Sequence, residues 1–232
     1  MNTTPAIEDL AAVSRSLGGR SPAEILDWAT RRYSPGLTMA TAMGAEGCCL
    51  VAMLASIGRP VRVFNIDTDY QFEETLETKA RLEEKYGITI ERVHASLTRE
   101  EIEAIHGPDL WKRDPVACCR IRKVEPLRET VAGAAAWISA IRRDQTPDRA
   151  KAEIVEWDAK FGLVKINPLL AWTWKDVWSY IHTHDVPFNP LHERGYPSIG
   201  CRPCTKPPAE GADPRSGRWN GERTECGLHA RG

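Results

Sequence analysis

The sequence predicts an α/β protein in which helices flank a parallel, doubly wound sheet. Two observations carry this prediction. Between residues 37 and 166, apolar segments of strand length alternate with longer segments of helix length, an order that places crossover helices between parallel strands. The chain also has 232 residues, of which 42% are hydrophobic, and this is enough to bury the core of one such domain.

The N-terminal part carries two helix-start signals. Thr4 precedes Pro5, which fits an N-cap followed by proline at the first helical position. Ser21 and Glu24 have the spacing of a capping box, and an apolar stretch begins at Ile25. Both segments are therefore predicted to begin helices.

The central part supplies the sheet. Strands are predicted over residues 37–43, 61–66, 88–93, 135–141 and 163–166, with helices over 48–57 and 72–86. The second of these helices is charged and amphipathic, and it stops at Gly87, a residue suited to a helix C-cap. Thr173 and Asp176 form another capping box, which predicts a last helix from Thr173.

Beyond residue 185 the composition shifts to Pro, Gly, Arg and Cys, with few apolar residues. The order of such a segment is expected to depend on the core, a metal or a ligand. We expect residues 1–185 to form the α/β unit and residues 186–232 to form a tail that belongs to the same domain.

The overall charge excludes one class of function. The chain has 31 Lys and Arg against 32 Asp and Glu, a net charge of −1, which argues against binding nucleic acid through a strong global field. Residues 1–17 lack the basic and apolar regions of a signal peptide, and no apolar run is long enough to span a bilayer. We therefore expect a soluble, cytoplasmic protein without a membrane or nucleic-acid partner.

The cysteines number seven, so a fully paired set of disulfides within one chain is impossible, and a reducing compartment is expected. Cys48 and Cys49 lie in an apolar run and are expected to be core residues. Cys226 stands alone near the end, with Arg223 before it and His229 after it. A cysteine in a basic, exposed setting is typical of a nucleophilic thiolate, and the alternative is an idle surface thiol.

The other four cysteines lie in polar segments, as the adjacent pair Cys118 and Cys119 and the C-x-x-C pair Cys201 and Cys204. They could ligate zinc or an iron–sulfur cluster, or they could be unrelated thiols. Adjacent helical side chains diverge by about 100°, which is awkward for one zinc ion. A cluster suits them better, because each thiolate can bind a separate iron.

Several polar residues are expected at one edge of the sheet. Gly44 opens a strand–turn–helix segment whose backbone N–H groups could hold a phosphate, although no Walker motif is present. Asp67 ends the next strand and could contact a ribose or cap the following helix. Arg142 follows a later strand, and arginine forks suit phosphate or sulfate. Arg218 and Arg223 add cations from the tail, although any one arginine could be a solvated surface charge.

These residues together resemble the assimilatory sulfonucleotide reductases, and specifically their adenylyl-sulfate branch. The resemblance covers most of the chain from residue 37 onward. It rests on the segments FNIDTDYQFEET (64–75), CCRIRKVEPL (118–127), WISAIRRDQTPDRA (137–150), LVKINPL (163–169), DVPFNPLHERGYPSIGCRPCT (185–205) and GRWNGERTECGLH (217–229). The combination of ECGLH with both cysteine pairs is specific, because the related phosphoadenylyl-sulfate reductases typically lack the pairs.

The resemblance implies a Rossmann-like sheet of the adenine-nucleotide α-hydrolase type with a flexible, catalytic C-terminal tail. It implies one 4Fe–4S cluster per chain, held by Cys118, Cys119, Cys201 and Cys204 and not thought to pass electrons. It implies reduction of adenosine 5′-phosphosulfate to sulfite and AMP through an S-sulfocysteine on Cys226. Thioredoxin or a similar dithiol would then release the sulfite, as a step of sulfate assimilation toward cysteine.

Further residues take their expected roles from the same resemblance. Lys123 matches a family lysine near the cluster and substrate, and we expect it to serve catalysis with His229. Arg142, Arg218, Arg223 and His229 match positions around the phosphosulfate. We expect these three arginines to bind the substrate, together with Gly44 and Asp67.

The phosphate loop departs from the family pattern. A serine and an aromatic residue usually precede Gly-Ala-Glu-Asp, whereas here Ala42 and Met43 precede Gly44 and Gly47 stands in place of the acid. Two alternatives remain open: a phosphoadenylyl-sulfate reductase, or a non-catalytic nucleotide-binding module with structural zinc. The sequence also leaves open whether the chain forms a homo-oligomer.

Overall fold

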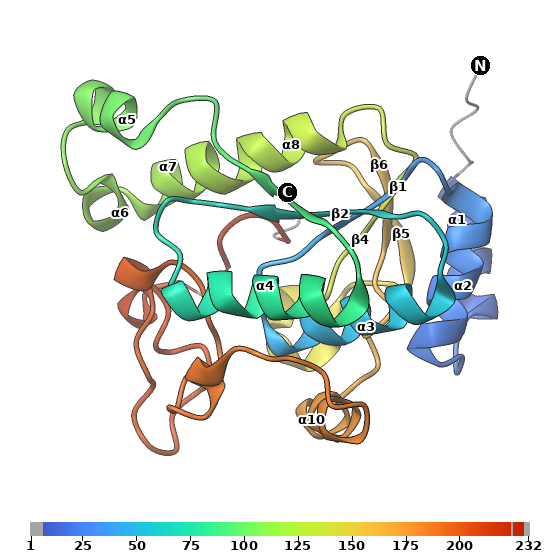
Figure 1. Ribbon diagram of the computed structural model, residues 1–232. Coiled ribbons are helices and arrows are strands. Elements are labelled where there is room, and N and C mark those ends of the chain that lie inside the picture. The colour runs from blue at the N-terminus through green and yellow to red at the C-terminus, as the bar shows by residue number, and fades with distance from the viewer. Residues whose placement is uncertain (1–6, 224, 230–232) are drawn as a thin grey trace.

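The computed structural model describes residues 7–223 and 225–229, and it folds around a six-stranded sheet (Figure 1). The strand order is β3-β2-β1-β4-β6-β5, and every neighbouring pair is parallel except β5 with β6. The strands are β1 (Leu37–Ala40), β2 (Arg62–Ile66), β3 (Ile90–Val93), β4 (Ala136–Ile138), β5 (Val155–Asp158) and β6 (Leu163–Ile166). The predicted α/β class is confirmed, with β5 as an antiparallel edge strand that the sequence did not predict.

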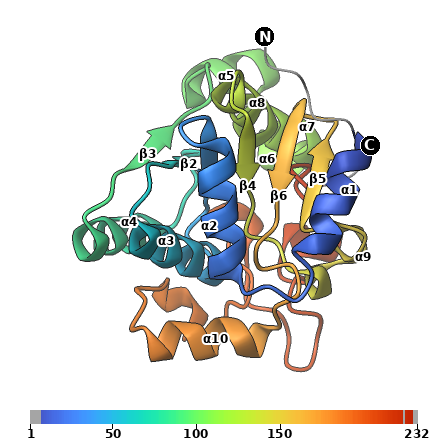
Figure 2. The ribbon, with the colours of Figure 1, turned by 90° about the vertical axis from the view of Figure 1, so that its right-hand side faces the viewer.

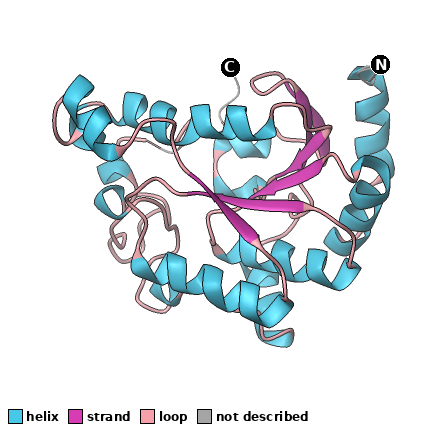
Figure 3. Ribbon diagram, turned by 45° about the horizontal axis from the view of Figure 1, so that its top comes forward, coloured by secondary structure: helices cyan, strands magenta, loops and turns pink. Residues whose placement is uncertain are grey.

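Helices cover both faces of this sheet. They are α1 (Ile7–Ser16), α2 (Pro22–Tyr33), α3 (Ala45–Ile57), α4 (Glu73–Tyr86), α5 (Arg99–His106), α6 (Leu110–Arg113), α7 (Pro115–Cys119), α8 (Glu125–Val131), α9 (Pro147–Ala150) and α10 (Trp174–Thr183). Figures 1 and 2 show α7 and α8 on one side of the sheet and α3 and α4 on the other, with α10 beyond them. The layering of helices around the strands is also visible in Figure 3. In the described residues, no helix is both long and apolar enough to cross a membrane.

The predicted helix ends are confirmed where the structure describes them. Ser21 and Glu24 form a reciprocal capping box at α2, and Thr173 and Asp176 form one at α10. Helix α4 ends at Gly87, whose φ of 62° is the left-handed C-cap conformation that favours glycine. The predicted N-cap at Thr4 and Pro5 lies outside the described residues.

The largest part of the core lies between the sheet and the layer of α2, α3 and α10. Cys48 and Cys49 on α3 are both 0% exposed there, which confirms that they are core residues. Burial raises the pKa of Cys48 to about 12, so this thiol is neutral at physiological pH. A second cluster around Phe64, Leu127 and Trp137 fills the space under α8 on the opposite face.

Residues 115–131 form one continuous helical segment with a change of winding in its middle. Helix α7 runs into the π-helical turn η1 (Arg120–Val124), which runs directly into α8. Such π-turns insert an extra residue into the helix and are frequent at functional sites. Here the turn directly follows Cys118 and Cys119.

The tail folds back on the α/β unit with little regular structure. It contains three short 3₁₀ turns, over Pro190–His192, Arg202–Cys204 and Trp219–Gly221. An isolated antiparallel bridge joins Thr205 to Arg218. These connections give the tail order within the described residues without a strand or α-helix after α10.

Candidate active site

A cavity of about 400 Å³ opens at the carboxyl ends of β1, β2 and β4, where α/β sheets bind ligands. We call it the central cavity. It is walled by the β1–α3 loop, by the segment after β4 that ends in α9, and by parts of the tail. Of the predicted site residues, it brings together Gly44, Lys123, Arg142, Arg218, Cys226 and His229.

The β1–α3 loop supplies one wall, and its packing explains the glycine at position 47. Gly44 is the N-cap of α3 and has no side chain between the first turn of the helix and the cavity. The Thr41 Oγ1 accepts a hydrogen bond from the Met43 N–H at 3.2 Å. A Cβ at Gly47 would collide with this hydroxyl. Thr41 therefore occupies the space that a side chain at position 47 would need.

Two of the predicted arginines are buried in the cavity wall. Arg142 is 6% exposed and donates to Glu46 at 2.9 Å and to Asp144 at 2.6 Å. Arg218, also 6% exposed, donates to Ser198 Oγ at 3.2 Å and lies 4.4 Å from the centroid of the Trp219 ring. Within the described part of the chain, its Nε has no hydrogen-bond partner. Arg218 therefore keeps a donor for an anion in the cavity.

Beside the central cavity lies a second, smaller recess, which we call the cysteine pocket. It is lined by Cys118, Cys119, Cys201 and Cys204, with Tyr70, Trp111, Pro115, Arg122, Lys123 and Trp219. Lys123 and Trp219 line both spaces. The two cysteine pairs are 82 residues apart in sequence, and both line the cysteine pocket. This pocket shares a wall with the central cavity.

The loop after β2 holds the two sides of the cysteine pocket together. Arg122 is 3% exposed and donates to the Thr68 carbonyl at 3.1 Å and to Asp69 at 2.6 Å. From the other side, the Arg202 N–H donates to the Tyr70 carbonyl at 2.7 Å. The Thr68 hydroxyl lies 3.2 Å from the Cys201 sulfur. Both cysteine-bearing segments are therefore fixed to the same loop, through Thr68, Asp69 and Tyr70.

The spacing of the sulfurs bears on which metal group fits. Among the residues that the structure describes, no three of the four cysteine sulfurs lie within 4.8 Å of one another. Thiolates on one zinc ion sit at about 2.3 Å from the metal in a tetrahedron, and so at roughly 4 Å from each other. A cluster accepts thiolates that are farther apart, because each binds a different iron. The pocket fits a cluster better than a single zinc ion.

Charges within the cysteine pocket shift several pKa values. Burial and the neighbouring thiols raise the pKa of Cys118 to about 12. Burial also opposes ionisation of Cys201, but the Lys123 ammonium and the Thr68 hydrogen bond outweigh it and lower the pKa of that thiol. Burial by itself would lower the pKa of Lys123, yet the negative charge that Cys201, Cys226 and Cys119 carry when ionised raises it. Lys123 therefore stays a cation between Cys226 and the pocket.

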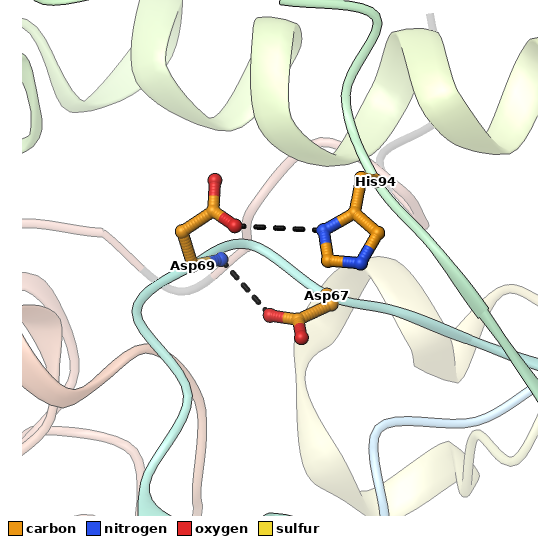
Figure 4. Close-up of side chains that lie close together, drawn as sticks. All are labelled: Asp67, Asp69 and His94. Carbon is orange, nitrogen blue, oxygen red and sulfur yellow. Dashed lines mark hydrogen bonds and ion pairs between the residues drawn. The ribbon is translucent and has the colours of Figure 1, made fainter. Parts of the chain in front are cut away.

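Asp67 lies outside the residues that line the central cavity. It belongs to a close group with Asp69 and His94, in which Asp69 N–H donates to Asp67 at 3.0 Å and the His94 Nδ1 lies 3.5 Å from Asp69 (Figure 4). Both carboxylates already have a cationic partner: Arg92 pairs with Asp67, and Arg122 pairs with Asp69. The group supports the loop after β2, and the expected contact of Asp67 with substrate stays a prediction.

Around Cys226, the tail makes three anchoring contacts with the α/β unit. Arg149 of α9 binds the Glu225 carboxylate through Nε at 2.6 Å and Nη2 at 2.9 Å. Lys160 donates to the Gly227 carbonyl, and the His229 ring stacks on Trp137. Burial lowers the pKa of His229 well below its usual value, and Arg149 and Lys165 nearby lower it further.

Sequence reasoning missed several cavity residues. Arg149, Glu46 and Trp219 line the cavity, and Glu225 immediately precedes Cys226 in the sequence. Arg149 falls within the segment 137–150 that resembles the family, and this is the signal that could have found it. Arg223 does not line the cavity, and its guanidinium carbon lies 5.6 Å from the Trp219 ring centroid.

Known proteins and one family model are similar to this chain. The family model for the phosphoadenosine phosphosulfate reductase domain matches residues 36–207. A protein of Geobacillus thermodenitrificans named adenosine 5′-phosphosulfate reductase is 47% identical over 208 residues, which cover 89% of this chain and 88% of the relative. Adenosine 5′-phosphosulfate reductase 1 of Bacillus subtilis is 46% identical over 207 residues, covering 88% and 89% of the two chains.

Solved structures share the fold. The phosphoadenylyl-sulfate reductase of Candida auris, in a phosphate complex, superposes with a TM-score of 0.79 at 28% identity, covering 89% of this chain and all of that one. The FMN adenylyltransferase of Candida glabrata reaches a TM-score of 0.60 at 16% identity over 89% of this chain and 69% of its own. The latter likeness concerns the fold alone.

Proposed function

Because the chain belongs to the phosphoadenosine phosphosulfate reductase family, we propose that it reduces adenosine 5′-phosphosulfate to sulfite and AMP, as a step of sulfate assimilation. The single observation that carries the proposal is that Cys226 and Lys123 line one cavity with Arg142 and Arg218. A nucleophile, a cation beside it and two buried arginines suit a small anionic nucleotide. The relatives named adenosine 5′-phosphosulfate reductase support the choice of substrate.

In the first step, the Cys226 thiolate attacks the sulfur of the substrate. A sulfur–sulfur bond forms, the bond from sulfur to the bridging oxygen breaks, and its electron pair leaves on the phosphate of AMP. The products are AMP and S-sulfocysteine at Cys226. Arg142, Arg218 and Lys123 would stabilise negative charge on the transferred sulfonate and on the departing phosphate, since fixed cations in a desolvated site act strongly there.

In the second step, a dithiol such as thioredoxin supplies the two electrons. One of its thiolates attacks the Cys226 sulfur and releases sulfite, which carries away the electron pair of the sulfur–sulfur bond. The second thiol then attacks the mixed disulfide, which leaves the donor oxidised and Cys226 as a thiolate again.

We further propose that Cys118, Cys119, Cys201 and Cys204 hold a 4Fe–4S cluster. When bound, the cluster would crosslink α7 to the tail and contribute charge next to Lys123. Cys226 stays outside this ligand set and remains available as the nucleophile. Lys123 would hold its proton between the two groups, consistent with the direction of its pKa shift.

The second candidate substrate is phosphoadenylyl sulfate, which the Candida auris structure favours because that protein is named for it. The paired cysteines favour the non-phosphorylated nucleotide. A sulfite assay in which the two nucleotides compete decides between them: a higher kcat/KM for adenosine 5′-phosphosulfate supports the proposal, and the reverse order overturns the choice of substrate.

The central experiment is anaerobic purification followed by a sulfite assay with adenosine 5′-phosphosulfate and a dithiol. We expect iron, sulfide and absorbance at about 400 nm, as thiolate-bound clusters give. Cys226→Ser should abolish sulfite formation while iron and colour remain. Sulfite formation by this variant would contradict the mechanism, and a colourless protein with one zinc ion would favour the non-catalytic module instead.

A further inference from the structure

The residue before Cys226 is a buried carboxylate that is fully engaged by the α/β unit. Glu225 is 6% exposed and accepts hydrogen bonds from both nitrogens of the Arg149 fork, at 2.6 and 2.9 Å. The Thr146 hydroxyl donates a third, at 2.9 Å. A second guanidinium, that of Arg215, lies 3.8 Å away. A bidentate, charge-assisted pair of this kind fixes orientation as well as distance.

We propose that Glu225 and Arg149 form a latch that closes the tail and positions the Cys226 sulfur in the central cavity. This inference rests on the proposed function, because the consequence of closure is attack by Cys226 on a bound sulfonucleotide. Neighbouring Cα atoms are about 3.8 Å apart, so fixing the Glu225 side chain leaves Cys226 little freedom of position. Both latch residues are positioning residues: neither is assigned contact with the reacting atoms.

The latch is joined to the substrate-binding wall by hydrogen bonds. Arg149 donates to the Gln145 side-chain oxygen, and the Gln145 amide donates to Glu46 Oε1 at 2.8 Å. Glu46 also accepts from Arg142 at 2.9 Å. A continuous set of contacts therefore runs from the carboxylate beside Cys226 to the arginine expected at the phosphosulfate. Glu46 and Asp144 hold Arg142 directly, so this arginine should keep its place when the Glu225 contact is lost.

The charge state of Glu225 agrees with this role. Burial opposes its ionisation, but the hydrogen bonds and charge of Arg149, with Arg215, lower its pKa below the usual value. The carboxylate is therefore ionised at neutral pH. Removal of Glu225 takes the carboxylate away from the buried Arg149 guanidinium, and removal of Arg149 leaves Glu225 with the more distant Arg215 guanidinium, 3.8 Å away. Such a loss is much costlier than the loss of an exposed ion pair.

The test compares Glu225→Gln, Arg149→Gln and the double variant with Glu222→Gln, the same substitution at an exposed position of the same tail. Three quantities are measured on the full-length, cluster-loaded enzyme. They are the single-turnover rate of S-sulfonation at Cys226, the affinity for AMP, and the rate at which iodoacetamide alkylates Cys226, followed by peptide mass spectrometry.

For Glu225→Gln we expect S-sulfonation to slow by about 100-fold, the scale of a group misplaced by about 1 Å. AMP affinity should be unchanged, and alkylation of Cys226 should be faster because the tail opens. The double variant should recover part of the rate lost in Arg149→Gln, since it pairs two neutral amides where the single variant leaves the Glu225 carboxylate without the Arg149 fork. Glu222→Gln should match the unmodified protein in all three measurements.

Unchanged S-sulfonation and alkylation in Glu225→Gln would overturn the latch. A parallel loss of AMP affinity in that variant would also overturn it, because the pair would then support the whole site instead of positioning Cys226. If the unmodified protein forms no sulfite, the proposed function fails, while the alkylation rates still decide whether Glu225 holds the tail closed.

Discussion

The imidazole of His229 stacks on the indole of Trp137, with ring centroids 5.9 Å apart and planes inclined by 3°. Trp137 lies on β4, so this contact places the described end of the tail against the central sheet. The His229 Nδ1 is buried without a hydrogen-bond partner among the described residues. Stacked, buried and surrounded by cations, the ring is held in its neutral form.

The first prediction concerns this histidine and pH. In the unfolded chain His229 binds a proton near its ordinary pKa of about 6.5, whereas the folded form stays neutral to lower pH. As the pH falls through about 6.5, the unfolded state therefore binds more protons than the folded state. The free energy of unfolding then falls as the pH decreases. In His229→Gln, the drop in stability between neutral and mildly acidic pH should be smaller. NMR titration of the ring checks this directly, and an ordinary pKa would contradict it.

The second prediction concerns the contact between Thr41 and Gly47. Gly47→Ala should destabilise the protein by about 1–3 kcal/mol, the usual cost of overpacking, because the new methyl collides with the Thr41 hydroxyl. In a Thr41→Ala background the same change should stabilise by up to about 1 kcal/mol, since alanine is the better residue inside a helix. Urea unfolding of the four proteins measures both effects. The same sign in both backgrounds would refute the pairing.

The third prediction concerns Gly200, whose Cα lies against the Arg218 guanidinium. A Cβ at this position would overlap the guanidinium nitrogens, so Gly200→Ala should push Arg218 out of the cavity wall. We expect nucleotide affinity to fall by about tenfold or more, the scale of a hydrogen bond to a charged group. Calorimetric titration with AMP and with the sulfonucleotide measures the loss. Combined with Arg218→Ala, the glycine substitution should cause no additional loss, and a fully additive effect would show that it acts elsewhere.

The fourth prediction separates the two kinds of buried cysteine. Cys204→Ala should remove a ligand from the cysteine pocket, and we expect lost iron, lost visible absorbance and a less stable tail. Cys49→Ala is the matched control, because Cys49 is buried in α3 away from that pocket. It should reduce stability slightly but keep the iron content. Equal iron content in both variants would argue against the proposed ligand set.

The extent to which the sequence predicts the fold follows from how local each signal is. Capping boxes at Ser21 and Thr173 and the glycine stop at Gly87 depend on neighbours a few residues away, and all three were predicted. The edge strand β5 was missed because only Val155 of its four residues is fully buried, so no clear apolar run marks it. The strand predicted over 135–141 ends at Ile138 because the following residues turn away to line the cavity.

The same difference between local and long-range signals applies to the residues of the site. The rule that parallel strands end at one edge placed Gly44 and Arg142 at the cavity. It did not say which way each side chain points, and the Asp67 carboxylate instead pairs with Arg92. The contact between Arg149 and Glu225 spans 76 residues of sequence, and no pattern in a single chain reveals such a partnership.

The π-helical turn after Cys119 has a consequence for how this chain tolerates insertions and deletions. Each residue of a helix turns the chain by about 100°. Deleting one residue from Arg120–Val124 would let α7 and α8 join as a regular α-helix and leave both cysteines on the same side, because the π-turn holds one extra residue. Deleting one residue from α8 would instead rotate Cys118 and Cys119 by that angle relative to the end of α8. Both thiols would then leave the side that faces Cys201 and Cys204. In this segment the number of residues, as much as their identity, sets the composition of the pocket.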